Sequence, residues 1–150
     1  MINLKSFTLF TMAILLSVAC SKTENNDMTQ NGQSGLESQL IKNTWIVAYY
    51  EDRGKDETSD FNGYSIQFSA DGSLLVSTGQ AKAQYKGSWM LTGNSDDSSS
   101  SGGKLIMAIS GNDVVRELEE DWRIIEWNET RLKLFDDSAD HTAYLNLVRM

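Results

Sequence analysis

The sequence has 150 residues, of which 40% are hydrophobic, and a formal net charge of −8 at pH 7. A chain of this length is expected to fold as one domain, and an acidic surface repels phosphate backbones, so we expect no nucleic-acid binding. The single cysteine excludes an intrachain disulfide and any metal site built from several cysteines.

An apolar run from Phe7 to Val18 has the length of a signal-peptide core. It is shorter than the roughly 20 residues that a membrane-spanning helix needs. The segment Leu16-Ser-Val-Ala-Cys20 then resembles a bacterial lipobox, in which a signal peptidase cuts before a newly lipidated cysteine. The resemblance implies that residues 1–19 are a lipoprotein signal peptide and that Cys20 anchors the mature protein in a membrane. The alternative is an ordinary secretory cut that leaves Cys20 as a free or buried thiol.

Residues 20–34 are expected to form a flexible tether, because this stretch has almost no apolar side chain to bury. The residue after the cysteine is Ser21 rather than Asp, and a resemblance to enterobacterial sorting rules favours the outer membrane, on either its periplasmic or its external face. Residues 35–150 remain as the folded domain. Ser34 and Glu37 have the spacing of a capping box, which predicts a short helix from Gly35 to Lys42.

Alternating apolar and polar residues after this helix predict β-strands. Tyr64 to Phe68 and Leu74 to Thr78 alternate on either side of Asp71-Gly72, a dipeptide typical of a hairpin turn. We expect strands that begin at Thr44, Tyr64, Ser73, Ala83, Lys104, Asp121, Arg131 and Thr142. In the first strand, Trp45, Val47 and Tyr49 are expected to share one face, and we expect a loop at Val114 to Glu120. Eight short strands without long intervening helices predict an all-β fold, either a meander sandwich or an antiparallel up-and-down barrel.

The domain resembles the lipocalin-like domain of small Gram-negative bacterial lipoproteins. The resemblance rests on the following motifs: Leu40-Ile-Lys-Asn-Thr-Trp45, Phe68-Ser-Ala-Asp71-Gly72, Gly87-Ser-Trp89, Glu120-Asp121-Trp122-Arg-Ile124, Leu132-Lys-Leu134 and Tyr144-Leu-Asn-Leu-Val-Arg149. It implies an eight-stranded barrel in which a tryptophan near the start of the first strand packs under a late arginine. Trp45 and Arg149 match these structural positions. In a closed barrel the first strand pairs with the last, which also places Trp45 beside Arg149.

The aromatic side chains are the candidate ligand-binding residues. Tyr64, Tyr85, Trp89 and Trp122 either fill the barrel or line a cavity that is open at one end. Two functions therefore stand. In the first, the barrel mouth of an envelope lipoprotein binds a small apolar or amphipathic ligand. In the second, the barrel is solid and its loops bind an envelope protein or a glycan.

No residue pattern in the sequence predicts catalysis, a metal ion or a cofactor. The only histidine, His141, lies in a polar loop and is expected to be solvated. The adjacent acids Asp96-Asp97, Glu119-Glu120 and Asp136-Asp137 are expected to diverge in extended chain, and calcium needs more oxygen ligands than Asp96 and Asp97 offer. Asp137-Ser138-Ala139 resembles an acceptor for O-glycosylation in Gram-negative envelope proteins.

Overall fold

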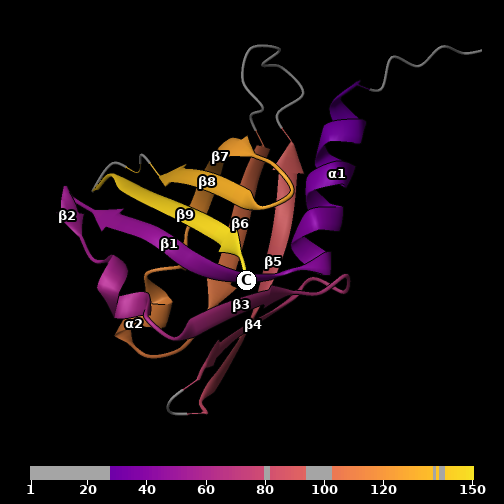
Figure 1. Cartoon of the computed structure of the whole chain (residues 1–150). Helices are drawn as coiled ribbons and strands as arrows, with labels where there is room; N and C mark the ends of the chain where they lie inside the picture. Colours follow the sequence, from indigo (N-terminus) through magenta and orange to yellow (C-terminus); the bar gives the residue numbers. More distant parts are fainter. Residues whose placement is uncertain (1–27, 80–81, 94–102, 137, 139–140) are drawn as a thin grey trace, which may run out of the picture.

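The computed structural model describes residues 28–79, 82–93, 103–136, 138 and 141–150. Its strands form one antiparallel sheet that closes on itself through the pairing of the first strand with the last (Figure 1). The strands are β1 (Thr44–Asp52), β2 (Lys55–Asp56), β3 (Tyr64–Phe68), β4 (Ser73–Thr78), β5 (Gln84–Gly93), β6 (Gly103–Ile109), β7 (Asp121–Trp127), β8 (Arg131–Asp136) and β9 (Ala143–Arg149). The predicted fold class, an eight-stranded up-and-down barrel, is confirmed, and β2 is only a short extension that pairs with the end of β1.

The closure of the barrel has the predicted register. Trp45 of β1 pairs with Arg149 of β9, and the ladder continues to Asp52 opposite Ala143. Directly opposite residues of antiparallel strands point to the same side of the sheet. Trp45 and Arg149 therefore share the inner face, where Trp45 is fully buried and Arg149 lies exposed at the end of the strand.

A β-bulge in β1 corrects one prediction. Val47 pairs with Leu147, but the next pair is Tyr49 with Asn146, so Ala48 has no partner in the ladder. An extra residue moves every following side chain to the opposite face. Tyr50 is consequently buried inside the barrel with 2% of its surface exposed, and Tyr49, predicted to share the face of Trp45, lies on the other side.

Two further corrections concern the helices, α1 (Met28–Lys42) and α2 (Asp113–Arg116). Residues 28–34, predicted as tether, belong to α1, because a helix nucleated by its buried end can add further turns at little cost. The predicted loop contains α2, which is capped by the Asn112 side chain accepting a hydrogen bond from the amide of Val115 at 2.9 Å. Within the described residues, no helix is long and apolar enough to cross a membrane.

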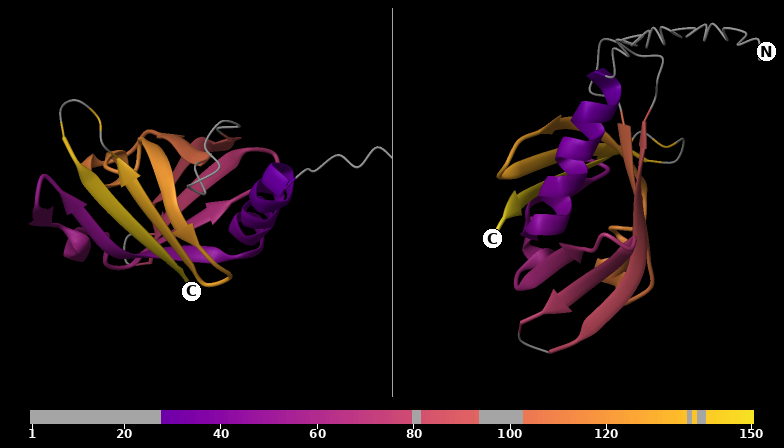
Figure 2. Two further views of the ribbon diagram at one scale, coloured as in Figure 1. Left: turned by 90° about the horizontal axis from the view of Figure 1, so that it is seen from above. Right: turned by 90° about the vertical axis from the view of Figure 1, so that its right-hand side faces the viewer.

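Large side chains occupy the inside of the barrel. Trp45, Tyr50 and Trp122 are among the largest fully buried residues. The indole N–H of Trp45 donates to the carbonyl of Leu40 in α1 at 3.2 Å, and α1 packs along β3 and β5 (Figure 2). The buried residues Val115 and Leu118, in α2 and just after it, belong to the same core. The end of the barrel where β1 and β8 end and β7 and β9 begin is called the rim below.

Candidate functional site

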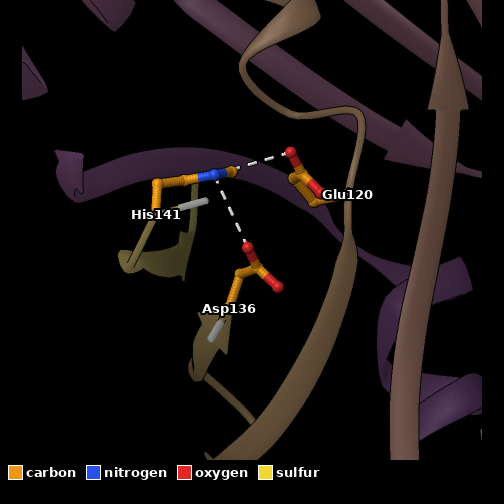
Figure 3. A group of neighbouring side chains, drawn as sticks. All are labelled: Glu120, Asp136 and His141. Carbon is orange, nitrogen blue, oxygen red and sulfur yellow. Dashed lines mark ion pairs between the residues drawn. The ribbon is translucent and has the colours of Figure 1, made fainter. Parts of the chain in front are cut away.

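Three side chains from neighbouring strands meet at the rim: Glu120, directly before β7, Asp136, the last residue of β8, and His141, in the connection to β9. Nε2 of His141 lies 3.6 Å from Oε1 of Glu120 and 3.5 Å from Oδ2 of Asp136 (Figure 3). Antiparallel neighbours place the start of one strand beside the end of the next, so the meander brings these positions together. We call these three residues the rim cluster.

The carboxylate of Asp136 is the most deeply placed member of the rim cluster. Asp136 is 7% exposed, and its Oδ2 has no hydrogen-bond partner among the described residues. Oδ1 of Asp52, at the end of β1, likewise has no hydrogen-bond partner among the described residues. Both aspartates pair with Ala143, one from each side, so the two carboxylates lie on the inner face of the barrel wall.

His141 is held by Ser138. The Ser138 hydroxyl donates to the His141 carbonyl at 3.4 Å, and the same oxygen lies 3.1 Å from Nδ1 of the ring. A hydroxyl whose proton is given to a carbonyl can accept the Nδ1 proton. In that tautomer the lone pair of Nε2 faces the carboxylates of Glu120 and Asp136.

The electrostatics of the rim favour positive charge. Loss of hydration raises the pKa of Glu120, and the neighbouring carboxylate of Asp136 raises it further, while His141 lowers it. Burial, followed by a 3.0 Å hydrogen bond to Glu117, raises the pKa of Tyr50. Glu120 and Asp136 both lie within ion-pair distance of His141, whose ring is charged only when it is protonated, so two carboxylates face at most one cation in the rim cluster.

The sequence did not predict the rim cluster. His141 was expected to be solvated, but its side chain is 18% exposed and faces two carboxylates. In the sequence Glu120 is adjacent to Glu119 and Asp136 to Asp137, whereas the fold brings Glu120 and Asp136 together from different pairs. The predicted strand order could have revealed the rim cluster, because the predicted strand boundaries place all three residues at the same end of consecutive antiparallel strands.

A second feature is a groove between β1 and β3. The ladder between these strands has only two residue pairs, Thr44 with Gln67 and Trp45 with Ile66. Beyond them the strands separate, and a groove of about 400 Å³ lies between them. Its apolar lining is contributed by Ile46, Val47, Phe61, Tyr64 and Met150, and its polar lining includes Ser65, Ser77 and Thr78. The groove is partly open to solvent, and more of its lining surface is apolar than polar.

The four predicted ligand-binding aromatics do not gather around one opening. Tyr64 lines the groove, and its hydroxyl accepts a hydrogen bond from Asn112 at 2.9 Å. Tyr85 is half-buried against the core. Trp89 and Trp122 are 8% and 0% exposed, and their N–H groups donate to the carbonyls of Ser69 and Leu118. These two tryptophans are therefore part of the filling of the barrel.

The predicted contact between Trp45 and Arg149 is present as a strand pair. Among the described residues, however, the cation over an aromatic ring is Arg123, 5.8 Å from the centre of Phe135. Cys20, the predicted signal peptide and Asp96-Asp97 lie outside the described residues. Of the predicted glycosylation acceptor only Ser138 is described, and it is exposed.

Comparisons with known proteins support the class of fold. No family model and no curated protein matches the sequence. Among solved structures, the chain is similar to the crystal structure of a DUF4847 family protein from Bacteroides vulgatus ATCC 8482. The two share 14% sequence identity with a TM-score of 0.51, over 76% of this chain and 96% of the other. At this identity the likeness concerns the barrel fold alone.

Proposed function

We propose that this protein is a non-catalytic, lipid-anchored envelope protein of a Gram-negative bacterium that binds a small amphipathic molecule in the groove between β1 and β3. The observation that carries the proposal is the groove itself, because its apolar walls and its hydroxyl-bearing edge offer both kinds of contact. The interior of the barrel is a poorer candidate, since Trp45, Trp89 and Trp122 are buried in its core.

The binding site is tested by filling the groove from its edge. Ser65 lines the groove, whereas Ser88 is an exposed serine on β5. We expect Ser65→Trp to weaken binding of n-octanol by at least about tenfold, a cost of about 1.4 kcal/mol, and Ser88→Trp to leave it unchanged. A neutral probe avoids repulsion by the acidic chain, and calorimetry measures the affinity.

Equal affinity in both variants would contradict the proposed site. A circular dichroism spectrum of each variant verifies that the added tryptophan leaves the barrel folded.

The membrane anchor is tested separately. Two or more acyl chains on Cys20 would hold the protein on a membrane, because each buried methylene contributes about 0.8 kcal/mol. We expect Cys20→Ser to move the processed protein from the membrane fraction to the soluble fraction. Mass spectrometry distinguishes processed from unprocessed chains, and a processed variant that still sediments with membranes would contradict lipid anchoring.

In the second function the loops bind an envelope protein or a glycan, and one observation favours binding of such a partner by strands on the outside of the barrel instead. Phe135 and Tyr144 pair across β8 and β9 with ring centres 4.9 Å apart, and Tyr144 is 38% exposed. Exposed aromatic rings supply contact area to proteins and sugars alike. If n-octanol does not bind but an envelope partner is lost on Tyr144→Ala, this second function replaces the first.

A further inference from the structure

We propose that Glu120, Asp136 and His141 bind a divalent transition-metal ion, with Zn²⁺ as the ion that fits best. This site goes beyond ligand binding in the groove, which is lined by none of these residues. The three potential ligand atoms lie within 4.8 Å of one another.

The two separations from Nε2 of His141 match a shared cation better than direct hydrogen bonds. Nitrogen and oxygen ligands lie about 2.0–2.2 Å from zinc, so two of them in a tetrahedral arrangement are about 3.3–3.6 Å apart. Nε2 of His141 is 3.6 Å from Oε1 of Glu120 and 3.5 Å from Oδ2 of Asp136. A good N–H···O hydrogen bond would be about 2.7–3.2 Å long.

A second observation, independent of these distances, is that the buried carboxylate of Asp136 lacks a hydrogen-bond partner at one oxygen. Its residue is more than nine-tenths buried, and Oδ2, the atom directed at His141, accepts no hydrogen bond from the described residues (Figure 3). A buried carboxylate oxygen without a hydrogen-bond partner costs free energy that a bound cation would recover. Zinc in this position would contact Oδ2 and Nε2 together.

The surroundings hold the three groups in place. The Glu120 carbonyl accepts the amide of Met107 in β6 at 3.1 Å, and Asp136 is fixed by its strand pair with Ala143. Ser138 contacts Nδ1 of His141 and orients the ring, the role that outer-sphere partners have in known metal sites. Two of the three ligands are therefore positioned by the β-sheet.

The ligand types select the class of ion. Imidazole with carboxylates suits zinc and its neighbours, whereas calcium and magnesium prefer sites made only of oxygen. The side chain of Glu120 is 33% exposed, so solvent reaches the cluster and can complete the coordination. A bound ion would join the start of β7, the end of β8 and the connection to β9.

The test uses the full chain without a histidine tag, in a mild detergent, and Zn²⁺ alone as the probe. His141 is the only histidine of the sequence, so its ring gives a single, assignable set of NMR signals. We expect one Zn²⁺ per chain by calorimetry and a saturable shift of these ring signals at the same stoichiometry. Absence of binding at micromolar Zn²⁺, or binding that leaves the ring signals unmoved, would overturn the proposal.

A matched pair of variants locates the site. Glu120→Gln removes a proposed ligand, and Glu119→Gln makes the same change at the exposed preceding residue. We expect the first to lower Zn²⁺ affinity by more than about tenfold, since losing even an outer-sphere partner costs about 10- to 100-fold, and the second to leave it unchanged. Equal affinities, or displacement of Zn²⁺ by equimolar Ca²⁺, would show adventitious binding to the acidic surface and overturn the proposal.

Discussion

At the scale of single residues, Trp45 connects three parts of the barrel. Its side chain is fully buried, its N–H donates to Leu40 of α1, and its backbone pairs with Ile66 of β3 and Arg149 of β9. Arg149 lies exposed on the same face. The packing of the indole, rather than the charge beside it, therefore stabilises this closure.

Substitution of the two residues separates these contributions. We expect Trp45→Ala to lower the free energy of unfolding by about 3–5 kcal/mol, as for other large buried aromatics. Arg149→Ala should change it by less than about 0.5 kcal/mol, as is usual for surface positions. Denaturant unfolding measures both, and a coupling above about 0.5 kcal/mol in the double variant would show that the guanidinium does pack on the indole.

Two features of single residues were not predictable from the sequence: the bulge in β1 and the burial of His141. The period of two in β1 predicted its existence, but nothing in the sequence marks Ala48 as the bulge that moves Tyr50 inward. Likewise, the sequence places His141 in a loop and predicts that it is solvated. Its side chain is largely buried because the fold brings it beside Glu120 and Asp136, and no sequence motif connects these three residues. Tertiary contacts of this kind leave no local signature.

At the scale of elements, the strands and the end of α1 at Lys42 were predictable, whereas the start of α1 and the turn of α2 were not. Alternation and turn residues are local, so the predicted starts of the eight barrel strands agree with the observed ones to within a residue. The start of α1 depends on how far a helix docked on the barrel propagates, which the polar stretch before Gly35 does not show. The single turn of α2 was also not predicted, because so short a helix has no periodic pattern of apolar residues.

Docking of α1 gives a prediction for this element. Leu40 is fully buried and its carbonyl accepts from Trp45, whereas Glu37 on the same helix is exposed. We expect Leu40→Ala to destabilise the protein by about 2–5 kcal/mol and Glu37→Ala by less than about 0.5 kcal/mol. Thermal unfolding of the two variants provides the measurement; similar melting temperatures would show that α1 contributes little to the core.

At the scale of the whole molecule, the barrel is closed, its core holds large buried side chains, and the sequence has a formal net charge of −8. Closure by β1 and β9 was predictable from the strand count, but whether the interior is hollow was not, because volume depends on how the side chains interdigitate. Because large side chains are buried in the core, we place the proposed ligand in the groove, where β1 separates from β3 after two pairs. A bound molecule there would contact the wall of the barrel and leave its centre unchanged.

A proton–nitrogen correlation spectrum recorded during titration with n-octanol distinguishes binding in the groove from binding inside the barrel. The indole N–H groups of Trp45, Trp89 and Trp122 donate to the carbonyls of Leu40, Ser69 and Leu118, and all three side chains are buried, so their signals report on the core. We predict that these three signals stay in place while the amide signals of Ile46 and Ser65 in the groove shift. Shifts of the indole signals of Trp89 and Trp122, with the groove amides unmoved, would show that the ligand enters the barrel and would contradict binding in the groove.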